Sequence, residues 1–424
     1  MIKAAATEGD ARALAALPAT PGRACDVAVV GAGLAGSIAA TMLARAGHSV
    51  VIIDPHRTYP DDFRCEKFDD GQMAVLKKIG LSDTVTAAST HDRSVWVSLL
   101  GHLAEKRPSD QMGFDYGPLV NRLRAELPPS VTQIHGKVTA VANSPDRQSV
   151  SISTGETIEA RLVVLASGLN NALREQLGIE RVDLCRCQSI TFGFDMEPLA
   201  GASFPFRALT HYGEHPRFRA AYITLFPIGT RMRANFFVYR DLADPWLRAF
   251  RDAPEATLSA AMPRLERLTG PFRIVGPVKM RPIDLYETTG YLTPGLVLVG
   301  DAFGTACPAG GSGARKALVD VERLCNGHVS RWLATPGMGV EKIASFYADP
   351  EKVAHDRRSL ALAYSIKAMA LDESPIFWAR RWMKLALTRV RWAKIAISSA
   401  FSRPLAPILD RGIEASAGPS RPRG

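Results

Sequence analysis

The sequence lacks any run of about 18 consecutive apolar residues, the length that a membrane-spanning helix requires. Its first 24 residues carry charges among their alanines, so they also lack the apolar centre of an export signal. These two absences argue against the membrane-spanning and exported classes. They predict a cytoplasmic protein with a mobile extension over residues 1–24.

Cysteine is scarce and scattered. Among the six cysteines, only Cys185 and Cys187 are close in sequence, and their spacing matches neither a zinc knuckle nor a C-x-x-C redox pair. The sequence also has no G-x-S-x-G, H-E-x-x-H or G-x-x-x-x-G-K motif, which would indicate a serine hydrolase, a zinc protease or a P-loop protein. We therefore predict reduced thiols, no metal site and none of these three chemistries.

Acidic residues are few at the C-terminal end, where ten basic residues are set against two acidic ones from residue 374 onward. This segment supplies most of the formal net charge of +10, so the rest of the chain is nearly neutral. A nearly neutral body is not typical of a protein that binds nucleic acid. With 424 residues, 46% of them hydrophobic, the chain is long enough for two or three globular domains.

What the sequence does have is a glycine-rich turn between a strand and a helix. The apolar, β-branched run 27–30 is typical of a buried parallel strand, and Gly31, Gly33 and Gly36 follow it in G-x-G-x-x-G spacing. The first glycine allows a tight turn, the second lets a pyrophosphate approach the backbone, and the third lets the helix 37–46 pack against the strand. The helix N-terminus then favours a phosphate through its free N–H groups and its dipole.

An acidic residue completes this unit. A second strand, residues 49–53, ends in Asp54, about 20 residues beyond the glycines, where a carboxylate can accept a hydrogen bond from a ribose 2′-hydroxyl. An acid at this position argues against a 2′-phosphate. The unit therefore predicts binding of the ADP half of FAD or NAD rather than NADP.

Two later segments repeat the change from strand to glycine turn. A strand over residues 162–166 runs into a Ser-Gly pair, and one over residues 295–299 ends in a Gly-Asp pair. After the second, residues 308–313 carry a proline and glycines at the expected start of a helix. Between the two segments, strands and turns from about residue 187 to 281 indicate an antiparallel layer inserted into the nucleotide-binding fold.

These three motifs stand in the order and spacing of the FAD-dependent aromatic hydroxylases, the p-hydroxybenzoate hydroxylase-like flavoproteins, which the chain resembles over residues 25–335. Prenyl-chain reductases and flavin halogenases are related to this family, but the Trp-x-Trp-x-Ile-Pro segment of the halogenases is absent. The resemblance implies FAD, and together with the glycine turn it gives these cofactor-binding candidates: Gly31, Gly33, Leu34, Ala35, Gly36, Asp54, Arg64, Arg122, Val138, Gly168, Gly300, Asp301, Pro308, Gly311, Ser312 and Gly313. Cys307, beside the third motif, is either a redox or flavin-linking thiol or a packing residue. The sequence names no catalytic acid or base.

The chain departs from the family pattern at several positions. Ser167 replaces an aspartate that the family associates with handling of nicotinamide and flavin, which leaves the choice between NADH and NADPH open. Phe303 and Gly304 replace the usual Ala and His, and Ser312 replaces Gln. Arg315 stands where Asn is common, and it either faces the flavin ring as a fixed cation or lies in solvent.

Together the patterns predict an α/β fold, with a Rossmann-like FAD-binding domain, an inserted antiparallel β-rich substrate domain and a helical C-terminal region. The expected divisions are 1–24 for the extension; 25–90, 117–180 and 282–335 for the discontinuous FAD-binding domain; 91–116 and 181–281 for the substrate domain; 336–410 for the helical region; and 411–424 for a disordered tail. We expect the substrate pocket between the two domains.

The basic C-terminal region has an amphipathic pattern. Over residues 376–397, one helical stripe carries Arg380, Lys384, Arg391 and Lys394. The opposite side carries Trp378, Trp382, Leu385 and Trp392. Such a helix either lies on an anionic membrane surface or caps the flavin domain with its tryptophans buried.

By its resemblance, the chain is expected to be an NAD(P)H-dependent monooxygenase that hydroxylates or epoxidises an apolar or aromatic small molecule with O₂, through a flavin hydroperoxide. Two alternatives remain open. One is an FAD-dependent prenyl-chain reductase of the geranylgeranyl type, and the other is a flavin-binding, membrane-associated protein without turnover. The substrate and the oligomeric state are not encoded in any pattern that we recognise.

Overall fold

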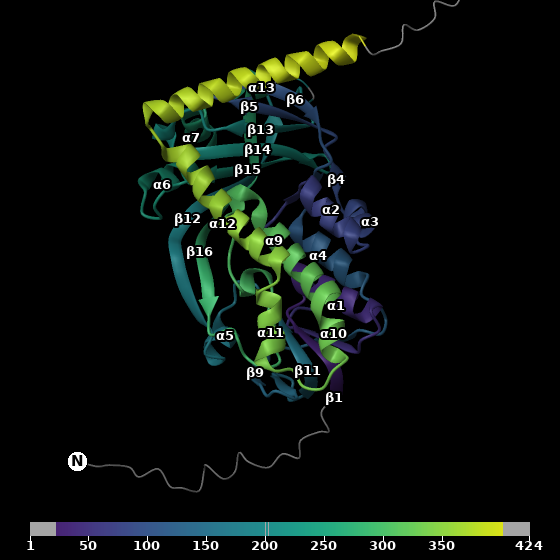
Figure 1. Cartoon of the computed structure of the whole chain (residues 1–424). Helices are drawn as coiled ribbons and strands as arrows, with labels where there is room; N and C mark the ends of the chain where they lie inside the picture. The colour runs from purple at the N-terminus through teal and green to yellow at the C-terminus, as the bar shows by residue number, and fades with distance from the viewer. Residues whose placement is uncertain (1–22, 200, 202, 402–424) are drawn as a thin grey trace, which may run out of the picture.

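The computed structural model describes residues 23–199, 201 and 203–401 (Figure 1). The expected extension over residues 1–24 lies outside this range except for Arg23 and Ala24, which begin the first strand. The expected tail over residues 411–424 lies outside it entirely. None of the described helices combines the length and the hydropathy that a membrane crossing needs.

The first sheet is mostly parallel, and the glycine-rich turn follows one of its strands. Its central strand, β1 (Arg23–Val30), pairs in parallel with β2 (Val50–Asp54) on one side and with β11 (Thr157–Leu165) on the other. The remaining strands are β8 (Thr132–His135), β9 (Val138–Ala142), β10 (Gln148–Ile152) and β17 (Leu296–Leu298). β10 pairs antiparallel with the first half of β11, and β17 pairs in parallel with its second half. The carboxyl ends of β1, β2, β11 and β17 therefore meet at one edge, where all the predicted motifs follow.

Apolar side chains cover both faces of this sheet. On one face, α1 (Leu34–Arg45), α4 (Tyr116–Ala125) and α9 (Ser312–Glu322) pack against β1 in a core that includes Val27 and Ile38, neither of which is exposed. On the other face, Ala28 and Val163 belong to a second buried cluster. Burial on both faces explains why the predicted strand reads as an uninterrupted apolar run instead of an alternating one.

The second sheet is antiparallel apart from one pair. Its strand order is β16 (Phe272–Thr289), β12 (Glu180–Pro198), β15 (Arg231–Val238), β14 (Ala220–Ile228), β13 (Ala208–Tyr212), β5 (Ser94–Leu99) and β6 (His102–Pro108). The pair β13 and β5 is parallel, with Ala208 opposite Val95. Segments that are distant in the sequence, around residues 94–108 and 180–289, thus form one continuous surface.

Shorter elements complete the fold. The small third sheet contains β3 (Lys67–Phe68), β7 (Met112–Gly113) and β4 (Thr90–His91). The other helices are α2 (Asp70–Lys78), α3 (Ser82–Ala87), α5 (Ala172–Gln176), α6 (Pro245–Asp252), α7 (Pro254–Ala261), α8 (Glu266–Thr269), a π-helical turn (Arg323–Val329), α10 (Ser330–Leu333), α11 (Val340–Tyr347), α12 (Pro350–Leu371) and α13 (Pro375–Phe401), with single 3₁₀ turns at Pro216–Phe218, Gly300–Ala302 and Pro308–Gly310.

The C-terminal helices connect the two sheets. α12 contacts both α9 and β14, and α13 then crosses the outer edge of the second sheet beside β6 (Figure 1). The predicted α/β architecture with helices at its C-terminal end is confirmed. The division into domains stays a prediction, and the expected boundary at residues 281 and 282 falls inside the single strand β16.

Candidate functional site

A cavity of about 300 Å³ lies where the carboxyl edge of the first sheet meets the second sheet. Most of the predicted cofactor residues line it: Gly31, Gly33, Leu34, Ala35, Asp54, Arg64, Gly168, Gly300, Asp301, Pro308, Gly311 and Gly313. Val138 lines an adjoining cavity, which shares Gly31 and Asp54 with the first. Gly36, Ser312 and Arg122 line neither of these cavities.

The glycine turn has the geometry that a dinucleotide needs. Gly31 has φ +100°, and a Cβ at this residue would lie 2.6 Å from the carbonyl oxygen of Ala166. A Cβ on Gly36 would collide with the carbonyl oxygen of Gly31, so this glycine lets α1 pack against the turn. At Gly33, the nearest atom to a Cβ is 3.9 Å away on Tyr59, so this side of the backbone is open to the cavity. The open face at Gly33 fits a pyrophosphate.

Asp54 is anchored at the end of β2. Its Oδ2 accepts a hydrogen bond from the N–H of Ala32 at 2.8 Å, and its Oδ1 accepts one from the N–H of His56 at 2.9 Å. A carboxylate has about four acceptor positions, so these bonds fix the group and leave capacity for a ribose hydroxyl. The residue lines both cavities, as a contact to the sugar between adenine and pyrophosphate requires.

Arg122, a predicted cofactor-binding residue, lies away from the cavity, and Arg124 of the same helix lies at the glycine turn. The Arg122 side chain is 51% exposed and pairs with Glu126 at 2.8 Å on the outer side of α4. Arg124 instead reaches the glycine turn, where its Nε donates to the carbonyl oxygen of Ala32 at 2.7 Å and its guanidinium lies 3.1 Å from Asp54. Arg124 is therefore the α4 arginine that supports the nucleotide end of the site.

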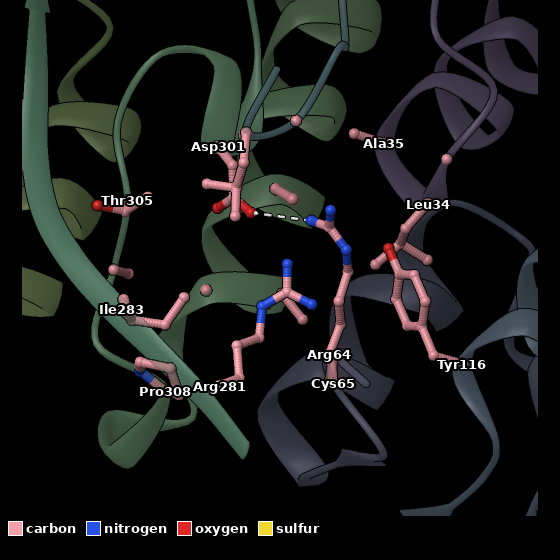
Figure 2. A pocket seen from close by; sticks show the side chains of 18 of the residues that line it. Leu34, Ala35, Arg64, Cys65, Tyr116, Arg281, Ile283, Asp301, Thr305 and Pro308 are labelled. Atoms are coloured by element: carbon pink, nitrogen blue, oxygen red, sulfur yellow. Dashed lines mark ion pairs between the residues drawn. The ribbon is translucent and has the colours of Figure 1, made fainter. Parts of the chain in front are cut away.

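Arg64 and Asp301 face each other across the cavity. Nη1 of Arg64 lies 3.6 Å from Oδ2 of Asp301, and Figure 2 shows both side chains pointing into the space that Arg281 also enters. Arg64 and Arg281 are held in place by Asp62, with which each forms an ion pair. Enclosure in the cavity wall raises the pKa of the Asp301 carboxyl, and the Arg64 guanidinium partly offsets this. Arg281, which the sequence analysis missed, thus joins the predicted pair.

A buried ion network holds the Gly-Asp turn. Oδ2 of Asp320, on α9, accepts a hydrogen bond from the N–H of Gly300 at 2.8 Å and one from Nζ of Lys316 at 2.9 Å. Its Oδ1 accepts one from Nζ of Lys352 at 2.9 Å. Asp320 and Lys352 are each only 1% exposed. The network connects Gly300, the residue before Asp301, to α9 and α12. No sequence motif indicated this network.

The third motif is fixed from both sides. Tyr222, on β14, donates its hydroxyl hydrogen to the carbonyl oxygen of Ala309 at 2.6 Å. Gln72, on α2, donates to the carbonyl oxygen of Gly311 at 3.0 Å. Because Tyr222 belongs to the second sheet and Gln72 packs beside the first, residues 308–313 are held where the two sheets meet.

The open alternatives at this motif now have structural answers. Arg315 is exposed and packs over Gly71, outside the cavity wall, so it does not face the cavity. Cys307 is fully buried with its Sγ 3.5 Å from Oγ of Ser189, and burial raises the pKa of this thiol, which fits a packing role. Phe303 packs against Tyr347, with ring centroids 4.8 Å apart, and is also absent from the cavity wall.

The second sheet forms the far wall of the cavity. Phe237 pairs with both Tyr222 and Thr191 on neighbouring strands, so these three side chains form one row across the sheet. Thr224 and Asn235 form the next row, and all five line the cavity. The sequence placed strands here but not their registers, so it named none of these wall residues.

The residues present fit FAD. The open backbone at Gly33, the anchored carboxylate of Asp54 and the carboxyl of Asp301 line two cavities that share Gly31 and Asp54, and they suit a pyrophosphate, an adenosine ribose and a ribityl chain, respectively. The N-terminus of α9 adds a positive dipole end beside Gly311 and Gly313, which favours negative charge on a reduced isoalloxazine ring. These features define a dinucleotide-binding α/β protein whose second sheet forms the far wall of the cavity.

Comparison with known families makes this assignment specific. The family model described as "FAD binding domain" matches residues 24–327. The chain therefore belongs to this family, and it is an FAD-dependent oxidoreductase, as the three motifs predicted.

The relatives agree with this assignment. The chain is 28% identical over 380 residues to "Ubiquinone hydroxylase UbiL" of Rhodospirillum rubrum, covering 84% of each protein. It is 30% identical over 181 residues to "Squalene monooxygenase" of Rattus norvegicus, covering 38% of this chain and 31% of the relative. The crystal structure of p-nitrophenol 4-monooxygenase PnpA from Pseudomonas putida DLL-E4 matches with a TM-score of 0.68 at 16% identity, over 88% of this chain and 98% of that one. This last likeness concerns the fold.

Proposed function

We propose that the protein is an NAD(P)H-dependent monooxygenase that inserts one oxygen atom of O₂ into an apolar or aromatic small molecule. The similarity to ubiquinone hydroxylase UbiL, which covers 84% of both chains, carries this proposal. The cavity supports this proposal, because Phe63, Phe237 and Ile283 give part of it an apolar lining that would exclude water from a bound substrate.

Each part of the chain has a separate task in this reaction. FAD supplies the electron transfer and the oxygen activation when it is bound. Gly33 and Asp54 would hold the ADP half of FAD, and Asp301 would hold its ribityl chain. The N-terminus of α9 favours the negative charge that reduction brings to the ring. The side chains of the second sheet that line the cavity would exclude water from a bound substrate.

The proposal predicts a specific steady-state behaviour. The purified, FAD-loaded protein should oxidise NADH or NADPH slowly alone, and a correct aromatic substrate should stimulate both nicotinamide oxidation and O₂ consumption. Matched rates, followed at 340 nm and with an oxygen electrode, check this result. Reduction of the substrate under anaerobic conditions would indicate a prenyl-chain reductase instead. Bound FAD that neither nicotinamide reduces would indicate a flavoprotein without turnover.

We also propose that α13 brings the protein to the cytoplasmic surface of an anionic membrane. The helix packs inward through Leu385, which is 3% exposed and contacts Leu100 and Ala104, so it covers the second sheet. The alternative that this helix caps the flavin domain is wrong, because α13 contacts β6, which is an edge strand of the second sheet. Trp378 packs inward beside Leu385.

The outward side of α13 carries an apolar stripe with a basic stripe beside it. Exposed apolar residues recur at helical spacing along one stripe: Ile376, Met383, Leu387 and Val390. The predicted basic stripe is exposed and lies along one side of these residues, and the helix has no acidic residue in its sequence. An exposed apolar stripe beside a row of cations matches an anionic lipid surface, where the apolar residues would insert between headgroups.

This surface gives a direct prediction. Leu387→Glu places a charge at the centre of the stripe, and it should weaken binding to phosphatidylglycerol-containing vesicles by at least about tenfold, because it removes buried apolar area and adds repulsion. Leu242→Glu, at an exposed residue of a loop before α6, is the control and should bind as the wild type does. Vesicle sedimentation at low and high salt measures both. Wild-type protein that stays in the supernatant at low salt would refute membrane contact.

A further inference from the structure

Arginines from two other parts of the chain hold the turn between β5 and β6. Nη1 of Arg264, in the segment between α7 and α8, donates a hydrogen bond to the carbonyl oxygen of Leu100 at 2.8 Å and lies 3.2 Å from Nε2 of His102. Nε of Arg389, on α13, donates to the carbonyl oxygen of Leu103 at 2.9 Å. Leu100 and Leu103 flank His102 in the sequence, so two guanidinium groups are fixed close to this histidine.

Positive charge is in excess around the His102 ring. Burial lowers the pKa of His102, and three guanidinium groups lower it further. They belong to Arg264, Arg389 and Arg267, which together with His102 we call the arginine cluster. Glu214 acts in the opposite sense and pairs with Arg264 at 3.8 Å. Within the described residues, Arg267 and Arg389 have no carboxylate within ion-pair distance, so the cluster has more cations than acids.

Several hydrogen-bond donors of the arginine cluster have no acceptor. Because a guanidinium group can only donate, Nε2 of His102 accepts from Arg264, and the hydrogen of the neutral ring lies on Nδ1. Nδ1 of His102 and the terminal nitrogens of Arg389 donate to no atom in the part of the chain that the structure describes. A guanidinium group presents its donors as a planar fork that matches the oxygens of a phosphate. The cluster therefore offers the charge and the donors that a phosphate group requires.

An exposed tryptophan lies beside the cluster. The centroid of the Trp382 ring is 5.9 Å from that of His102, and Trp382 is 48% exposed. The helical period of α13 places Trp382 and Arg389 on one flank, between the inward-facing Leu385 and the exposed apolar stripe. Tryptophan rings favour the level of the lipid headgroups. A membrane that receives the apolar stripe would thus bring its headgroups toward the cluster.

A phosphomonoester matches the cluster better than a phosphodiester does. A phosphomonoester carries a charge of about −1.5 to −2 at pH 7 and three acceptor oxygens, whereas a phosphodiester carries a single negative charge. The larger charge suits a cluster in which Arg267 and Arg389 both lack an acidic partner. Among membrane lipids, phosphatidic acid has a headgroup of this kind.

We propose that the arginine cluster binds the phosphate group of an anionic phospholipid, with a preference for the phosphomonoester of phosphatidic acid. Arg267 and Arg389 would pair with its charge, and Nδ1 of His102 would donate to one of its oxygens. Acyl chains beside the apolar stripe of α13 make a lipid a better ligand than free phosphate. This inference rests on the proposed contact of α13 with an anionic membrane, and it names the lipid that this contact favours.

Vesicle binding of the FAD-loaded protein tests the preference. Phosphatidylcholine vesicles that contain either phosphatidic acid or phosphatidylglycerol are adjusted to equal zeta potential, so that non-specific attraction is the same. We expect the dissociation constant for the phosphatidic acid vesicles to be at least about tenfold lower, because charge-assisted hydrogen bonds add to that attraction. Sedimentation measures both constants. Equal constants would overturn the proposal.

Arg389→Gln and Arg391→Gln form a matched pair, because both residues are exposed on α13 and lie about 200° apart around the helix. Arg389→Gln should reduce the preference for phosphatidic acid to about twofold or less, and Arg267→Gln should do the same. Arg391→Gln removes the same charge outside the cluster. It should weaken binding to both kinds of vesicle by a similar factor of about fivefold and keep the preference. An unchanged preference in Arg389→Gln would contradict the assignment.

The pKa of His102 locates the ligand and identifies its source. Dihexanoyl phosphatidic acid, below its micelle concentration, should raise this pKa by about one or more, because a bound anion favours the imidazolium. Inorganic phosphate should need at least about tenfold higher concentrations for the same effect, since it has no acyl chains. NMR of labelled histidine rings follows the titration, with His102→Gln to identify the signal. An unchanged pKa would refute the site, and equal potency of the two ligands would refute a lipid as its occupant.

The results separate this inference from the proposed membrane contact. Equal binding of the wild type to both kinds of vesicle would refute the arginine cluster as a headgroup site and leave the membrane contact of α13 intact. A protein that binds neither kind at low salt would refute the membrane contact. If dihexanoyl phosphatidic acid still raised the pKa of His102 in that protein, recognition of the phosphate by the cluster would stand.

Discussion

Gly33→Ala should leave the protein folded and lower its affinity for FAD by at least about a hundredfold. The added methyl group meets no protein atom closer than 3.9 Å, so the turn itself has room for it. It would, however, stand on the open side of the backbone, where the pyrophosphate must come into contact. Fluorescence titration with FAD measures the loss, and circular dichroism with thermal melting shows that the fold persists.

Two other glycines serve as controls for this variant. Gly36→Ala should destabilise the protein itself, because its methyl group collides with the Gly31 carbonyl oxygen. Gly327→Ala should leave FAD binding unchanged, since the nearest atom, on Arg323, lies at an ordinary 3.7 Å. If Gly33→Ala binds FAD as tightly as the wild type, the pyrophosphate does not lie at this turn.

Asp320→Asn should destabilise the protein by about 3–5 kcal/mol, the usual effect of breaking a buried ion pair. Lys352 and Lys316 would lose their shared carboxylate while both stay buried, at 1% and 5% exposure. Denaturant unfolding of the two proteins measures the difference. FAD should also bind less tightly, because a displaced Gly300 moves Asp301.

Asp356→Asn is the matched control for that substitution. Asp356 accepts a hydrogen bond from Lys352 at 2.9 Å, but its side chain is 27% exposed and water can replace it. A loss of about 1 kcal/mol or less is expected. Equal losses of unfolding free energy in the two variants would mean that the burial of Asp320 adds nothing to the stability of the fold.

Local patterns in the sequence were sufficient for the cofactor half of the site. Gly31, Gly33 and Asp54 lie within one strand, helix and strand, so their arrangement follows from short-range geometry alone. The choice between Arg122 and Arg124 does not, because two residues on a helix differ by about 200° and only packing decides which side faces the sheet. The roles of these residues toward FAD remain proposals that the variants above can test.

The substrate half was largely hidden from sequence reasoning. Lys67 lines the cavity but belongs to a strand of only two residues, which is too short to show any periodicity. From the sequence alone, Asp320 and Lys352 would be placed on the solvent-exposed faces of two helices. Only the packing of α9 on α12 shows that they are buried together. Asn235 becomes part of the wall through strand registers, which depend on partners far away in the sequence.

The long strands β12 and β16 share an irregular segment in their pairing. They run together over most of their length, but their ladder is interrupted between Asp183 and Ser189 by shifts in pairing. A β-bulge bends the strand that carries it and increases the local twist. We expect that any widening of the site for the exchange of bulky molecules would occur at this bend, between Asp183 and Ser189. A widening at this bend would move Arg281, which pairs with Thr191 beyond it, away from Asp62 and would break their ion pair.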